Sequence, residues 1–175
     1  MKLIEAMKQV KDLLVKADDL RKKIANHSAY LSLETPVYKD QTEQVRQWLQ
    51  AHEDIMQKIG ELQVRIARTN LATNVTIELG GVVVTKCITE WIVRRGNGKE
   101  KNGTAALDLQ AFKQLTDRNL REGSVPSTLN AEPTKVTIVR CYSPEQRDIK
   151  LELYRSEPHL IDSTLEVINA TTELL

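Results

Sequence analysis

Apolar residues recur in alternating steps of three and four along the start of this chain, and again from Leu151 to its end. In the first stretch the series is Leu3, Met7, Val10, Leu14, Ala17 and Ile24, with Arg21 as a polar interruption. Because an α-helix turns once in 3.6 residues, this spacing gathers the side chains into one stripe and predicts a helix that packs on another helix. Further apolar residues, Ile4, Leu13 and Leu20, widen the stripe beyond what one partner helix covers.

A second helix is predicted after the loop around Pro36. Asp40 followed by Glu43 has the form of a capping box, and the helix should run to about Asn70. Its apolar series is Val45, Trp48, His52, Ile55, Ile59, Leu62, Ile66 and Thr69. The two helices are expected to form an antiparallel hairpin over residues 1–71.

The remaining residues, 72–175, predict a smaller α+β region. Gly80-Gly81 between Val75–Leu79 and the valines that follow is typical of a two-residue strand turn, and residues 85–95 should form a short helix. A further helix is expected from Thr104 to about Asn119, and residues 135–142 should form a strand covered on both faces.

The last helix should begin at Ser143-Pro144, where a capping hydroxyl precedes a proline at the first helical position. Its apolar series is Leu151, Tyr154, Pro158, Ile161, Leu165, Ile168, Thr172 and Leu175. Pro158 lies within that series, so we expect a kink there. The fold class is therefore α+β and predominantly α, with this C-terminal helix packing back on the hairpin.

Composition and charge exclude several classes of protein. The net charge of +1 argues against bulk nucleic-acid binding, and no apolar run approaches the length of a membrane span. Residues 1–26 carry seven Lys or Arg against four Asp or Glu, whereas residues 143–175 carry three against seven. We expect these complementary end segments to lie close together. One disulfide between Cys87 and Cys141 is possible, but we expect small buried thiols in a reducing compartment. The N-terminal apolar run contains charges and does not resemble a signal peptide, so the protein is expected in the cytoplasm of a bacterial or infected cell.

Residues that could carry chemistry form no recognisable motif. The three histidines, His27, His52 and His159, lack partners at metal-ligand spacing, and the glycine- and lysine-rich segment 96–103 lacks the spacing of a phosphate loop. The charged residues between Arg147 and Asp162 favour an ion-pair network between helices over an acid–base site. We expect no catalytic residue, metal or cofactor.

Two stretches, RIARTNLATNVTIELGGVVVTKCITEWIVRR and ELYRSEPHLIDSTLEVINATTEL, carry a resemblance to a known family. With the MKLIEA opening they resemble the septicolysin-like family of small uncharacterised bacterial and phage-encoded proteins. The resemblance rests on scattered residues: Thr69, Asn70, Arg155, Ser156, Glu157, Asn169 and Thr172. It implies an α-rich fold that assembles into rings, and residues 96–133 depart from the family pattern.

The leading functional hypothesis is a non-catalytic structural protein that acts as a homo-oligomer. Its partners would be copies of itself and, given the family's phage members, other virion proteins of a capsid-bound, connector or tail assembly. The side chains expected on the packing seams are Leu3, Met7, Val10, Leu14, Trp48, Ile55, Ile59, Leu62, Trp91, Leu151, Tyr154, Ile161, Leu165 and Ile168.

Two alternatives stay open at the level of the sequence. One is a metal-dependent hydrolase or nucleotide-binding enzyme whose site is shared between subunits, with His52, His159, Glu157 and Asp162 as its candidates. The other is an adaptor that docks on a helix or strand of a partner.

Overall fold

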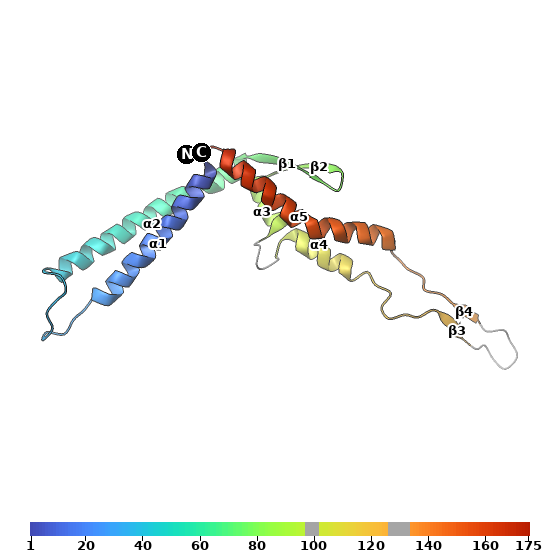
Figure 1. Cartoon of the computed structure of the whole chain (residues 1–175), viewed down its shortest axis with the longest axis horizontal. Helices are drawn as coiled ribbons and strands as arrows, with labels where there is room; N and C mark the ends of the chain where they lie inside the picture. The colour runs from blue at the N-terminus through green and yellow to red at the C-terminus, as the bar shows by residue number, and fades with distance from the viewer. Residues whose placement is uncertain (97–101, 126–133) are drawn as a thin grey trace. The chain divides into compact units, whose positions relative to one another are not determined.

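A computed structural model describes residues 1–96, 102–125 and 134–175, and these ranges fold into helices with two small sheets (Figure 1). The helices are α1 (Leu3–His27), α2 (Gln41–Ala72), α3 (Ile88–Arg95), α4 (Thr104–Lys113) and α5 (Pro144–Thr171). The strands are β1 (Asn74–Leu79), β2 (Val82–Cys87), β3 (Gly123–Val125) and β4 (Thr134–Val136), and they pair as β1–β2 and β3–β4. The predicted α+β fold with a dominant helical hairpin is confirmed.

The chain divides into two compact units. The first comprises Met1–Val75, Cys87–Thr89 and Leu165–Leu175, and the second comprises Thr76–Lys86 and Glu90–Thr164. The hairpin therefore forms one unit with the end of α5, while β2, α3, α4 and most of α5 belong to the other.

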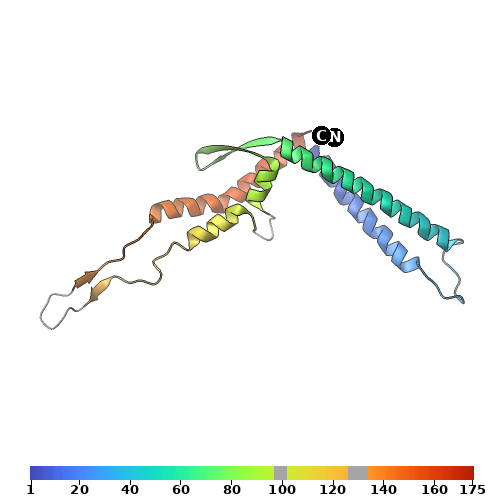
Figure 2. The same ribbon diagram turned by 180° about the vertical axis from the view of Figure 1, so that it is seen from behind.

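The hairpin of the first unit is built as predicted along α2. Asp40 caps this helix by accepting a hydrogen bond from the backbone N–H of Glu43 at 3.0 Å, although the Glu43 carboxylate turns to Arg46 at 2.7 Å. Every residue of the predicted α2 series is buried or half-buried, with Ile59 and Leu62 exposed by only 3% and 6%. Figure 2 shows α1 and α2 lying side by side along their length.

The buried stripe of α1 differs from the prediction. Met7 and Leu14 were expected on the seam, but they are 39% and 48% exposed, and the neighbouring Ala6 and Leu13 are buried in their place. Both places hold two consecutive apolar residues, so spacing alone does not decide which one turns inward. The small Ala6 side chain allows the two helix backbones to approach closely, which the longer Met7 would prevent.

The two ends of the chain meet, with residues 1–3 beside residues 171–174 (Figure 1). The Leu3 backbone N–H donates to the Thr172 carbonyl at 2.9 Å, and the Lys2 ammonium lies 2.6 Å from a Glu173 carboxylate oxygen. The Leu175 N–H also donates to the Thr69 hydroxyl of α2 at 3.0 Å. These bonds fix the end of the chain to the open end of the hairpin.

In the second unit the turn between β1 and β2 has the predicted form. Gly80 and Gly81 have φ values of +57° and +81°, the left-handed region that a two-residue hairpin turn requires. Ser143 caps α5 by accepting a hydrogen bond from the Gln146 N–H at 3.3 Å. The helix continues through Pro158 without a break, and its ribbon bends near the middle (Figure 1). Since proline lacks an N–H and clashes with the preceding turn, it accounts for such a bend.

Three local predictions for this unit are wrong. Helix α4 is capped by Gly103 rather than Thr104 and ends at Lys113 rather than near Asn119. The strand predicted over 135–142 is reduced to its first residues, because β4 pairs with only three residues of β3 and a two-stranded ribbon gains little stability in water. Consequently Val139 is 84% exposed and Cys141 is exposed rather than buried.

Candidate functional site

The strongest candidate surface is an apolar stripe on the outside of the hairpin. Its members are large apolar side chains of both helices that are 39–62% exposed, and we call them the hairpin face: Ile4, Met7 and Leu14 of α1, and Leu49, Met56, Val64 and Leu71 of α2. They lie in unit 1 and add a second stripe beside the one that joins the two helices.

Helical geometry places both halves of the hairpin face on one side. Successive residues of an α-helix are turned by about 100° around its axis. On that basis the exposed residues of each helix are turned by roughly 70° to 165° from the mean direction of its buried residues, and the turn has the same sense in both helices. In two antiparallel helices that face each other, the same rotation on each leads to the same side of the pair. The hairpin is therefore apolar in its interior and on one outer face, which is the pattern of a helix that packs against two neighbours.

The side chains predicted on packing seams divide into three groups by burial. The buried group is Leu3, Val10, Trp48, Ile59, Leu62, Trp91, Ile161 and Leu165, and the half-buried group is Ile55, Leu151, Tyr154 and Ile168. Met7 and Leu14 form the exposed group and belong to the hairpin face.

The tip of the hairpin is organised by aromatic rings. His27, Tyr38 and Trp48 contact one another with ring centroids 5.3–5.6 Å apart, and the buried Gln41 side chain donates to the His27 carbonyl at 2.9 Å. The loop between the helices leaves Leu33 99% exposed. His27 thus serves as a packing residue that closes the tip.

A buried ion-pair cluster lies in the second unit, between α3, α4 and α5. The Arg94 guanidinium donates two hydrogen bonds to Glu157, Nε to Oε1 at 2.6 Å and Nη2 to Oε2 at 2.8 Å, and its third nitrogen donates to Asp108 at 2.5 Å. The Glu157 side chain is 2% exposed and the Arg94 side chain 17%. Bonding to Glu157 raises the pKa of Arg94, so the guanidinium stays charged. Arg94 also stacks on the Tyr154 ring, with its central carbon 5.3 Å from the ring centroid.

This cluster confirms an ion-pair network between helices. Arg94 and Arg95 both lie in the last turn of α3, and Arg95 pairs with Asp162 at 2.6 Å.

Two of the candidates for a shared enzymatic site, Glu157 and Asp162, are already paired. His52 belongs to unit 1, whereas Glu157, His159 and Asp162 belong to unit 2, and both acids are bonded to arginines. Within the described ranges no group of three or more His, Cys, Asp or Glu side chains could hold a metal ion. The lysine-rich part of the predicted loop, 97–101, lies outside the described residues.

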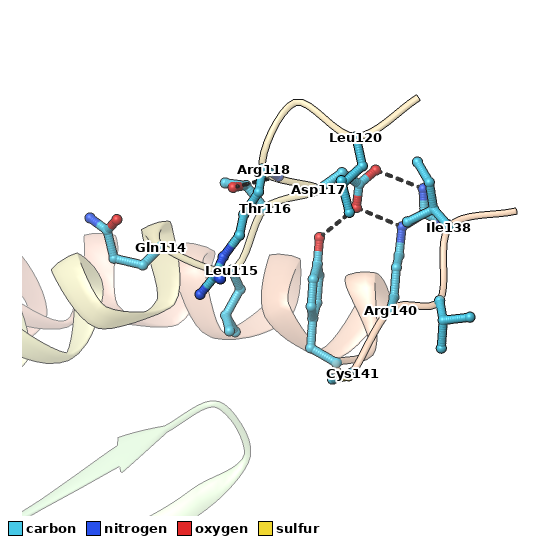
Figure 3. A pocket seen from close by; sticks show the side chains of 11 residues that line it. Gln114, Leu115, Thr116, Asp117, Arg118, Leu120, Ile138, Arg140 and Cys141 are labelled. Atoms are coloured by element: carbon cyan, nitrogen blue, oxygen red, sulfur yellow. Dashed lines mark hydrogen bonds and ion pairs between the residues drawn. The ribbon is translucent and has the colours of Figure 1, made fainter. Parts of the chain in front are cut away.

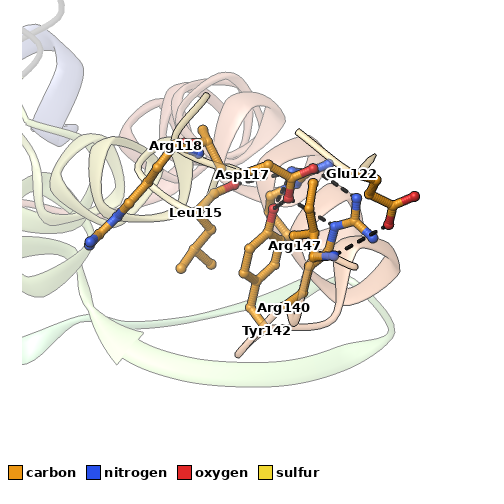
Figure 4. Close-up of polar contacts among 9 residues, drawn as sticks. Leu115, Asp117, Arg118, Glu122, Arg140, Tyr142 and Arg147 are labelled. Carbon is orange, nitrogen blue, oxygen red and sulfur yellow. Dashed lines mark hydrogen bonds and ion pairs between the residues drawn. The ribbon is translucent and has the colours of Figure 1, made fainter. Parts of the chain in front are cut away.

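A second polar cluster, which the sequence did not reveal, surrounds Asp117. The Asp117 carboxylate accepts from the Arg140 guanidinium at 2.8 and 2.7 Å and from the Tyr142 hydroxyl at 3.1 Å (Figure 4). Arg147 adds bonds to the Leu115 carbonyl at 3.1 Å and to the Tyr142 hydroxyl at 3.4 Å. Bonding to Arg140 holds the pKa of Asp117 below its usual value.

An open pocket of about 360 Å³ lies beside this cluster (Figure 3). Leu115, Leu120, Ile138 and Val139 supply apolar wall, while Asp117 and Arg140 supply the charged part. Because the Asp117 carboxylate is held by Arg140 and Tyr142, its bonds tie the segment after α4 to the segment before α5. The sequence signal for this polar cluster is weak, because a long irregular stretch separates Asp117 from Arg140.

No family model matches this sequence, and no curated protein matches it. A solved structure that shares the fold is the "crystal structure of a functionally unknown conserved protein from Corynebacterium diphtheriae". The sequences are 20% identical over 100% of this chain and 99% of the other, with a TM-score of 0.59. At that identity the likeness shows the fold alone. Within the described ranges no helix is long and apolar enough to cross a membrane.

Proposed function

We propose that this protein is a non-catalytic assembly protein that works as a homo-oligomer. The observation that carries the proposal is the hairpin face, a set of large apolar side chains on one side of the hairpin that its own unit leaves 39–62% exposed to water. Contiguous apolar surface of this kind marks sites of protein–protein contact in folded proteins.

The resemblance to septicolysin-like proteins supplies the concrete setting of the proposal. That family has phage-encoded members and a fold that assembles into rings. We therefore extend the proposal to a virion component, which would be capsid-bound or part of a connector or tail, with other virion proteins as further partners.

Size-exclusion chromatography with light scattering tests self-assembly directly. We expect the full chain to be oligomeric at micromolar concentration and the Met56→Glu variant to shift toward the monomer, because Met56 lies in the middle of the hairpin face and is already 45% exposed. Leu33→Glu is the matched control, since Leu33 is 99% exposed at the tip and lies outside the face. A wild-type chain that stays monomeric at these concentrations contradicts the proposal.

A further inference from the structure

We infer that the hairpin face is covered by the same face of a second copy, turned so that the two α1 helices run antiparallel and the two hairpins form a four-helix bundle. This inference rests on the proposed self-assembly and adds the surface, the orientation and the register. Its basis is the order of charged, large and small residues along the two exposed stripes.

The charged residues on the α1 stripe set the orientation. Lys11 and Asp18 lie on this stripe on either side of Leu14, and Lys11 precedes the midpoint between Leu14 and Val15 by as much as Asp18 follows it. A two-fold axis through that midpoint, perpendicular to the helices, brings Lys11 against Asp18 of the partner subunit, and the symmetry repeats the pair. Lys11 is exposed, and the Asp18 side chain is 36% exposed. Within its own helix Asp18 already pairs with Arg21 and, at 2.6 Å, with Lys22, so Lys11 of the partner subunit would be a further cation beside a carboxylate that stays accessible to solvent.

The other face-to-face arrangement is electrostatically unfavourable. A two-fold axis parallel to the helices would lay α1 of one copy over α2 of the other at the same level. The His27 and Trp48 rings, with centroids 5.6 Å apart, show which residues of α1 and α2 lie at the same height along the hairpin. At that alignment Asp18 of one copy lies within about one helical turn of Glu53 of the partner subunit. Both side chains are acidic, so this arrangement opposes like charges.

The α2 stripe agrees with the perpendicular axis through the sizes of its residues. If the axis crosses α2 at residue 58, within about one helical turn of the level that the His27 and Trp48 rings set, it brings Met56 near Gly60 of the partner subunit and Leu49 near Ala67 of the partner subunit. Each pairing sets a large side chain against a small one, which lets facing layers interlock. The space over Gly60 is open in the single chain, since a Cβ built there meets no atom within 4 Å.

A charge exchange in the full chain tests this register. The Lys11→Asp and Asp18→Lys variants each oppose two pairs of like charges across the axis, so the dimer dissociation constant should rise by about ten- to a hundredfold. The double variant restores opposite charges, and its dissociation constant should return to within a few-fold of the wild-type value. Sedimentation at several concentrations gives all four constants, and circular dichroism checks that each variant keeps its helices.

Disulfide trapping provides a measurement that does not depend on charge. In a background of Cys87→Ser and Cys141→Ser, the pair Lys11→Cys with Asp18→Cys should form a covalent dimer on mild oxidation. A bond within one helix is excluded, because seven residues separate the Cα atoms by about 10.5 Å, beyond the reach of a disulfide. Each single-cysteine variant is the control and should stay uncrosslinked, since like positions lie about as far apart across the axis.

The outcomes separate this inference from the proposed function. Restoration in the double variant together with the specific cross-link supports the inference. If the wild type assembles but the double variant stays weakened and the cysteine pair does not cross-link, the register is wrong while self-assembly stands. A single-cysteine cross-link also overturns the register. A monomeric wild-type chain removes both, and would mean that another part of the chain or another protein covers the face.

Discussion

Removing one partner of the buried ion pair between Arg94 and Glu157 should destabilise the protein far more than removing an exposed one. In the Arg94→Met variant the stem of the side chain is kept, but the Glu157 carboxylate loses both of its bonds, at 2.6 and 2.8 Å, while it is only 2% exposed. An unpaired buried charge costs about 3–5 kcal/mol of the free energy of unfolding. Loss of the stacking of Arg94 on Tyr154 adds about 1 kcal/mol or less.

The control removes the third partner of the same guanidinium. Asp108 bonds Arg94 but its side chain is 45% exposed, so Asp108→Ala should cost under about 1 kcal/mol. The assay is urea denaturation at one fixed chain concentration, because assembly would otherwise add to the apparent stability. If Arg94→Met costs no more than Asp108→Ala, Glu157 is hydrated in solution and the reasoning fails.

A double substitution checks the cause of the loss. Replacing both partners, as in Arg94→Met with Glu157→Leu, removes the charge together with the need to pair it. Such replacements are often neutral or stabilising by about 1–4 kcal/mol in other proteins. The double variant should therefore be more stable than Arg94→Met alone. If the double variant is as unstable as Arg94→Met, the loss of stability comes from lost packing of the side chains and not from the unpaired, desolvated Glu157 carboxylate.

Three further predictions concern other parts of the chain. Leu13→Ala should lower the free energy of unfolding by about 2–5 kcal/mol, because Leu13 is only 8% exposed, whereas Leu14→Ala, at 48% exposure, should lower it by under about 1 kcal/mol. Both are measured by urea denaturation at chain concentrations where the protein is monomeric. Equal losses would mean that α1 does not bury the side of the helix described above. The Lys2 ammonium and the N-terminal amine hold the pKa of Glu173 below 4.5, so the ion pairs of Glu173 stabilise the fold fully above about pH 4.5 and lose this effect as the pH falls through the lower folded pKa. The difference in Tm between the wild type and Glu173→Gln should therefore shrink on acidification. A difference in Tm that does not change with pH would contradict this. Gly81→Ala should cost about 1–2 kcal/mol because of its φ of +81°, with a smaller loss for Gly81→Asn, and an equal loss for both would point to a cause other than the backbone.

The elements that the sequence predicted well are those whose cause is local. The α2 seam follows from helical period over 32 residues, and the turn at Gly80-Gly81 follows from the backbone freedom of glycine. The cap at Ser143 follows from one hydroxyl placed before a proline. At the chain ends, the ion pair between Lys2 and Glu173 has the sign that the charge imbalance predicted.

The elements that the sequence did not predict depend on choices between near-equal local options. Leu13 and Leu14 are the same residue type at adjacent positions, and close packing on α2 decides between them. The segment 135–142 has strand composition, but strand preference depends on a partner, and β3 offers only three residues. Arg94 and Glu157 are 63 residues apart, so their pairing follows from tertiary folding.

The clear pKa shifts of the described residues belong to ion pairs that hold parts of the fold together. Every clear pKa shift in these ranges keeps its group charged: the pKa of Asp117 is lowered by Arg140, and that of Arg94 is raised by Glu157. A general acid or base needs the opposite, a pKa moved toward neutrality by burial or by a like charge. Ion pairs of this kind fix geometry, since neither partner exchanges its proton near pH 7. In the proposed assembly, burial of the exposed apolar side chains of the hairpin face would supply the free energy of association, and these ion pairs would keep the hairpin and the second unit in shape.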